Sequence, residues 1–139
     1  MSKYNTNLAS EFHVLSMLHR LGMDAYLTLG NKKMVDIIVS QEDGRLVTID
    51  VKGIAKKYDW PSDNIRPSRN DNHFVILVSY EGRIEDPTFM PSVWVIPHKK
   101  IGRFIKQYRK RKNVSRARIQ KNGEKFLNAW DLLSNHSVI

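Results

Sequence analysis

Two apolar stretches with the length of β-strands are each interrupted by an acidic residue. Asp36 lies within residues 34–39, Met-Val-Asp-Ile-Ile-Val, and Asp50 lies within residues 46–51, Leu-Val-Thr-Ile-Asp-Val. A charge inside a buried strand costs free energy unless it is paired or bound to a metal ion. The chain therefore has to fold so that each acid meets a partner or a cation.

The second acid belongs to the tripeptide Asp50-Val51-Lys52. Because strand side chains alternate between faces, Asp50 and Lys52 are expected on one face, and the other face is expected to carry Val47, Ile49 and Val51. In this arrangement the acid could hold a divalent metal ion, and the lysine could place its cationic group beside the same phosphate. The simpler alternative is an exposed ion pair, worth about 0–1 kcal/mol.

A third carboxylate comes from a predicted amphipathic helix over Leu8–Leu21, for which Asn5, Thr6 and Asn7 are candidate caps and Gly22 is the stop. Glu11 falls in the middle of its apolar arc, which consists of Leu8, Phe12, Val14, Leu15, Leu18 and Leu21. A helix that only covers a sheet would have leucine at that position. Glu11 is therefore expected to be buried with a partner or directed at a site.

Further elements follow from periodicity and turn signals. Strands are predicted at 25–29, 34–39, 45–52, 74–78 and 93–96, with turns at Gly30-Asn31 and Gln41–Gly44. A helix is predicted from the helical spacing of Ile101, Phe104, Ile105 and Tyr108, and a last one from Glu124 to Leu133. The expected class is α/β, with a mixed central sheet flanked by helices.

The composition fits a single domain over residues 1–139, with a basic C-terminal helical part at about 98–134. The chain is 41% hydrophobic and has no cysteine, which excludes disulfides, thiolate zinc sites and cysteine nucleophiles. It has no apolar stretch of the ~18 or more residues that a membrane helix needs and no apolar leader at its start. A cytoplasmic protein without membrane association is therefore expected.

The formal net charge of +9 is concentrated near the C-terminus, where Glu124 is the only acid between Pro97 and Lys125. A block of one sign favours a polyanionic partner. The residues expected to contact nucleic acid here are Lys106, Arg109, Lys110, Arg111 and Lys112. An anionic membrane surface or a purely solubilising role are the alternatives.

A second candidate binding segment separates the strands at 45–52 and 74–78. Basic and aromatic side chains alternate in it, as in segments that bind nucleic acid through phosphates and bases; they are Lys56, Lys57, Tyr58, Trp60, Arg66 and Arg69. A loop without structure of this length is uncommon in a compact domain unless it is functional. For Trp60, packing into the core is an equal alternative.

The candidate residues fit the hydrolysis of a phosphodiester bond. Mg²⁺ prefers hard oxygen ligands, which Asp36, Asp50 and the backbone carbonyl of Val51 would supply, with Mn²⁺ as a substitute ion. Lys52 could orient or deprotonate the attacking water or stabilise the transition state. Glu11 could bind the metal directly or through water.

These residues resemble the motif of the PD-(D/E)XK nuclease superfamily, which has the restriction endonuclease-like fold. Glu11 in the first helix, Asp36, and Asp50-Val51-Lys52 carry the resemblance, over roughly the first half of the chain. It implies an αβββαβ core and metal-dependent DNA cleavage at the acidic face. An acid in the first helix is most similar to the branch with archaeal Holliday junction resolvases, which implies structure-selective cleavage.

The sequence departs from the family pattern in three places. Val35 stands where the family name has proline, Asp50 takes the place of the glutamate option, and Pro61 and Pro67 interrupt the segment where a helix is expected. The five histidines show no metal-ligand spacing, so none receives a catalytic role.

Three functions are therefore compared. The first is a Mg²⁺-dependent DNA endonuclease. The second is a nucleic-acid-binding protein that keeps the fold without cutting, although such a relative would more often have lost an acid or the lysine. The third is a subunit that assembles with another protein. Small nucleases of this fold commonly dimerise, which makes a homodimer an expectation, but no sequence feature marks an interface.

Overall fold

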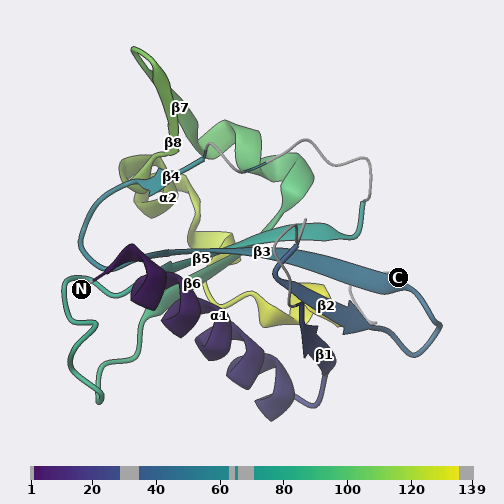
Figure 1. Ribbon diagram of the computed structural model, residues 1–139. Helices are drawn as coiled ribbons and strands as arrows, with labels where there is room; N and C mark the ends of the chain where they lie inside the picture. The colour runs from purple at the N-terminus through teal and green to yellow at the C-terminus, as the bar shows by residue number, and fades with distance from the viewer. Residues whose placement is uncertain (1, 29–34, 63–64, 66–70, 135–139) are drawn as a thin grey trace.

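The computed structural model describes residues 2–28, 35–62, 65 and 71–134. At its centre is a five-stranded sheet. Helix α1 (Lys3–Arg20) and the last 3-10 turn pack on one face, and a small three-stranded sheet with the other short helices packs on the other (Figure 1). The large sheet has the spatial order β1 (Asp24–Leu27), β2 (Ile37–Ser40), β3 (Leu46–Ile54), β5 (His73–Ser79) and β6 (Ser92–Pro97). The predicted α/β class with a mixed sheet is confirmed.

Strand β3 pairs antiparallel with one neighbour and parallel with the other. Strands β1, β2 and β3 are antiparallel in sequence order, β3 and β5 are parallel, and β5 and β6 are antiparallel. A parallel pair needs a crossover connection. Among the described residues of that crossover, the only regular element is β4 (Trp60–Pro61), so the helix implied between the third and fourth strands is not found there.

Two apolar clusters lie on the two faces of the large sheet. The cluster under α1 contains Val14 and Leu18 of the helix together with Val47, Ile49 and Val51 of β3. The cluster on the other face is built from β5, β6 and the small sheet, and includes Trp60, Val75, Leu77, Trp94 and Val114. Alternation along β3 therefore holds, and it directs Asp50 and Lys52 to the face that α1 does not cover.

Helix α1 is longer than expected at its beginning. Ser2 is the N-cap, and its hydroxyl accepts a hydrogen bond from the Asn5 backbone N–H at 3.1 Å, so the caps predicted at residues 5–7 lie inside the helix. The first turns of the helix are mostly polar, so apolar spacing gives no sign of where the helix begins. Gly22 follows the helix with a φ of +79°, as the predicted stop requires.

Strand β3 runs past its predicted end at Lys52. The hairpin turn before it is confirmed, because Gly44 donates to the Gln41 carbonyl at 3.0 Å with a φ of +86°. Beyond Lys52 the strand continues through Gly53, where an added Cβ would lie 1.8 Å from the Ser10 hydroxyl oxygen. Glycine here is therefore what lets α1 cross close over β3.

The helix predicted from Ile101 to Tyr108 is wrong. A 3-10 helix, η1 (His98–Phe104), is followed by the antiparallel hairpin β7 (Ile105–Tyr108) and β8 (Arg111–Val114), which joins β4 in the small sheet. In a helix, the like charges of Lys106, Arg109 and Lys110 would be neighbours three or four positions apart and would repel. The hairpin separates them, because Lys106 lies on one face of β7 and Arg109 and Lys110 form the turn.

The C-terminal segment is also divided differently from the prediction. Helix α2 (Arg116–Asn122) was not anticipated, and 3-10 turns η2 (Glu124–Phe126) and η3 (Trp130–Leu133) replace the expected continuous helix. Asn128 interrupts it with a φ of 53° and donates its N–H to the Val93 carbonyl. The strands 25–29 and 34–39 and the turn at residues 30–31 reach outside the described residues, which contain β1 and β2.

Candidate active site

Asp36 occupies the place where β2 leaves β3. The last paired residues of the two strands are Ile37 and Ile49, and Asp36 donates its backbone N–H to the Ile49 carbonyl at 2.9 Å. Its side-chain Oδ2 accepts a hydrogen bond from the Val51 N–H at 2.7 Å. The carboxylate thus replaces a backbone acceptor of the ladder, which places it next to the peptide that joins Asp50 to Val51.

Beyond this point β3 keeps its pairing with β5 on one side only, within the part of the chain that is described. Asp36 departs from the regular register, because its N–H bonds to Ile49, the residue that Ile37 already faces. Lys52 follows on the same face as Asp50 and is half-buried. The Asp36 carboxylate is therefore held beside the peptide between Asp50 and Val51, and its convergence with the side chains of Asp50 and Lys52 stays a prediction.

His73 is a site residue that the sequence analysis missed. Its Nε2 lies 3.1 Å from Asp50 Oδ2, and its Nδ1 lies 2.7 Å from the Thr48 hydroxyl oxygen. A neutral ring with its proton on Nε2 satisfies both contacts, because it donates to Asp50 and accepts from Thr48. The ring is buried and lies 5.1 Å from that of His98.

The position of His73 depends on pairing between distant segments. The parallel register sets His73 beside Thr48, two residues before Asp50. The only local signal was a histidine at the edge of the apolar run Phe74–Val78, which is also typical of a strand end at the surface. A contact with an acid more than twenty residues earlier could not be predicted without that register.

Glu11 is buried at 6% exposure, as expected, and lies on the helix that covers the other face of the sheet. An added Cβ at Gly53 of β3 would meet Ser10 and Thr6 of this helix, and Glu11 follows Ser10 directly. Convergence of Glu11 with the other three residues stays a prediction.

The donor set fits Mg²⁺ better than a transition metal. Among the described residues, no group of three or more His, Cys, Asp or Glu is arranged to hold an ion. Mg²⁺ needs only one or two carboxylates and keeps several waters, whereas zinc sites require three or four protein ligands. Asp36, Asp50 and the Val51 carbonyl are oxygen ligands of the kind that Mg²⁺ takes, and their assembly into one site stays a prediction.

The segment after β3 separates into binding candidates and a core residue. Lys56, Lys57 and Tyr58 are exposed, so they stay candidates for nucleic-acid contact. Trp60 was wrongly assigned to binding: it is fully buried, donates from Nε1 to the Val78 carbonyl at 3.1 Å and packs edge-on against Trp94. Two further candidates, Arg66 and Arg69, lie outside the described residues.

The basic block contains both exposed and buried side chains. Its hairpin residues, Lys106, Arg109, Lys110, Arg111 and Lys112, are all exposed. Arg116 is instead buried: its guanidinium donates to Ser79 Oγ at 3.0 Å and pairs with Glu81. Only part of the positive charge is therefore available to a partner.

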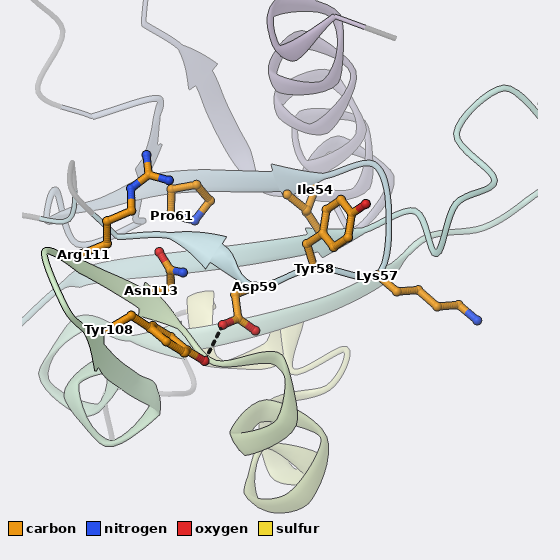
Figure 2. Close-up of a pocket in the computed structure, with 8 residues that line it drawn as sticks. All are labelled: Ile54, Lys57, Tyr58, Asp59, Pro61, Tyr108, Arg111 and Asn113. Carbon is orange, nitrogen blue, oxygen red and sulfur yellow. Dashed lines mark hydrogen bonds between the residues drawn. The ribbon is translucent and has the colours of Figure 1, made fainter.

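A shallow hollow of about 520 Å³ lies between the hairpin and the loop after β3 (Figure 2). Its lining residues are Ile54, Lys57, Tyr58, Asp59, Pro61, Tyr108, Arg111 and Asn113. Within it, the Tyr108 hydroxyl donates to Asp59 Oδ2 at 2.9 Å. The hollow begins two residues beyond Lys52, so it continues the face that carries Asp50 and Lys52.

Comparison with known proteins bears on the fold. No protein-family model and no curated protein sequence matches the chain. Among solved structures, the chain is similar to a bacterial homing endonuclease, I-Ssp6803I, with a TM-score of 0.61 and 19% identity over 99% of this chain and 94% of the other. The chain thus shares its fold with a structure of a nuclease. None of the described helices has the length and apolarity needed to cross a membrane.

Proposed function

We propose that this protein is a metal-dependent DNA endonuclease of the PD-(D/E)XK type. The observation that carries the proposal is the hydrogen bond from Val51 N–H to Asp36, which holds the Asp36 carboxylate at the peptide between Asp50 and Val51. The fold similarity to a homing endonuclease adds support. The exposed basic hairpin supplies a surface for a polyanion.

In this proposal Asp36, Asp50 and the Val51 carbonyl hold Mg²⁺, with Mn²⁺ as a substitute, and Glu11 contributes directly or through water. A bound divalent ion would neutralise charge on the phosphoryl oxygens and make a water molecule more acidic. Lys52 positions the attacking water or stabilises charge on the phosphate. His73 holds Asp50 through Oδ2, which leaves Oδ1 as the oxygen for the cation.

The test is cleavage of labelled nucleic acids by the purified protein. The panel contains one sequence as duplex DNA, single-stranded DNA, a four-way junction and RNA, each with Mg²⁺, Mn²⁺ or EDTA. We expect DNA cleavage with either ion and none in EDTA. Cleavage that persists in EDTA contradicts metal dependence, and a preference for the junction would identify the resolvase-like activity that the resemblance implies.

The alternative is a binding protein that keeps the fold but does not cut. It predicts DNA binding without product under every metal condition, so the same panel with a binding measurement separates the two functions. A homodimer remains a further proposal, because one site cuts one strand. Linear rather than nicked plasmid product, together with the mass in solution, tests it.

A further inference from the structure

The hairpin of β7 and β8 projects from the body of the molecule (Figure 1). Between Ile105 and Val114 it carries basic side chains and no acid. All the basic side chains are exposed, whereas Ile105 and Val114 join the apolar cluster at the base. The hairpin thus has an apolar root and a cationic outer part.

The cations lie on both faces of the hairpin. Residues directly opposite each other share a face, and the register pairs Lys106 with Asn113, Gln107 with Lys112, and Tyr108 with Arg111. Lys106 and Arg111 therefore lie on the face with Tyr108, and Lys112 lies on the other face. A ribbon that lay flat on one anionic surface would need charge on one face only, so this distribution indicates anions on both sides.

The hairpin is fastened to the body both at its base and beside its turn. Asp59 accepts from the Tyr108 hydroxyl through Oδ2 and from the Arg116 N–H through Oδ1, each at 2.9 Å. The bond to Asp59 raises the pKa of Tyr108, so its hydroxyl remains the donor. Arg118 also donates to the Ile105 carbonyl at 2.7 Å. A hairpin held in this way loses little conformational freedom on binding.

The turn at the tip has an unusual residue. Arg109 and Lys110 connect the paired residues Tyr108 and Arg111, and Arg109 has a φ of +30°. Tight hairpin turns with positive φ favour glycine or asparagine, so arginine costs stability at this position. A cost of this kind is typical of a side chain retained for function.

We propose that the hairpin inserts into the major groove of duplex DNA, with its cations contacting the phosphates of both strands. The proposal deepens the proposed function and rests on it, since it names the substrate as duplex DNA. The major groove, about 12 Å wide, admits a two-stranded ribbon, whereas the minor groove of undeformed B-DNA, about 6 Å wide, is too narrow for one. Phosphates border the groove on both sides, which matches cations on both faces of the ribbon.

The first experiment measures binding in EDTA by fluorescence anisotropy, so that nothing depends on cleavage. The Arg109→Gln/Lys110→Gln variant is compared with a control of equal charge change, Lys3→Gln/Arg20→Gln, which alters exposed cations of α1 on the other side of the sheet. We expect the hairpin variant to bind duplex DNA about tenfold more weakly, with a salt slope shallower by about two, because each lost phosphate contact removes about one released counterion. Equal binding by the two variants overturns the proposal.

The second experiment identifies the groove. Duplex DNA with glucosylated hydroxymethylcytosine is blocked in the major groove, and netropsin blocks the minor groove. We expect weak binding of the first duplex and unchanged binding in the presence of netropsin. Competition by netropsin, or equally tight binding of single-stranded DNA, contradicts major-groove insertion.

An Arg109→Gly variant separates binding from folding. Glycine relieves the positive φ, so the melting temperature should be maintained or rise while duplex affinity falls. Wild-type affinity in this variant would refute a role for the tip. If the hairpin variants lose duplex binding but the wild-type protein cuts nothing, the groove proposal stands and the nuclease proposal fails. If the wild-type protein cuts DNA and the hairpin variants cut it equally well, the nuclease proposal stands and the groove proposal fails.

Discussion

The acidic site at β2 and β3 and the basic hairpin of β7 and β8 place their charges in opposite ways. Asp36 and Asp50 are held by a backbone N–H and by His73 inside the large sheet. The hairpin cations stand in solvent on a ribbon that is fastened to the body at its base and through Tyr108. A charge removed from water needs a hydrogen-bonding or ionic partner, which fixes its geometry, as catalysis requires. An exposed charge acts over a longer range and attracts a polyanion.

The comparison predicts that burial, not residue type, decides the cost of a substitution. Trp60 of β4 and Tyr58, two residues before it, test this most strongly. Trp60→Ala should destabilise the protein by about 3–5 kcal/mol, because a fully buried ring is lost. Tyr58→Ala should stay within about 0.5 kcal/mol, since its ring is 62% exposed. Urea unfolding measures both, and similar losses would contradict the buried position of Trp60.

Asp50→Asn should separate chemistry from binding. We expect cleavage to fall by about 10² to 10³-fold, because a charged ligand is removed from the site, while duplex affinity in EDTA changes little. The melting temperature should be maintained or rise, since clustered negative charge is relieved. Glu85→Gln, an exposed acid of the loop before β6, is the matched control. An Asp50→Asn enzyme with wild-type rate would remove Asp50 from the active site.

The basic block itself contains a buried cation, Arg116, and an exposed one, Lys121, whose substitutions can be compared. Arg116→Ala leaves Glu81 and Ser79 with fewer partners and should cost about 2–3 kcal/mol, less than a fully buried pair because Glu81 is partly exposed. Lys121→Ala, in the same helix and exposed, should change the free energy of unfolding by under about 0.5 kcal/mol. Equal stability of the two variants would show that the Arg116 pair contributes nothing.

His73→Gln should have the smallest of these effects. It removes the ring that holds Asp50 and Thr48, so we expect about a tenfold lower cleavage rate and a higher Mg²⁺ concentration for half-maximal activity. A purely structural role would lower stability without moving the metal dependence. His19→Gln, an exposed histidine of α1, is the control.

The helix wrongly predicted from Ile101 to Tyr108 shows where local apolar spacing fails. The apolar spacing of Ile101, Phe104, Ile105 and Tyr108 agrees with a helix, but Phe104 and Ile105 pack into the cluster while Tyr108 reaches Asp59 from a strand. Helical periodicity over one or two turns cannot be distinguished from the junction of a 3-10 helix and a hairpin. The partner that decides between them, β4, lies more than forty residues earlier.

The sequence by itself determined the strands of the large sheet, the face shared by Asp50 and Lys52, and the concentration of positive charge near the C-terminus. These follow from local alternation and composition, which do not depend on distant contacts. Only the tertiary structure decided that Asp36 binds the Val51 N–H, that His73 meets Asp50, and that Trp60 and Arg116 are buried. Those features depend on strand register and on a crossover between segments far apart in the chain, whose free energies come from packing that no local pattern encodes.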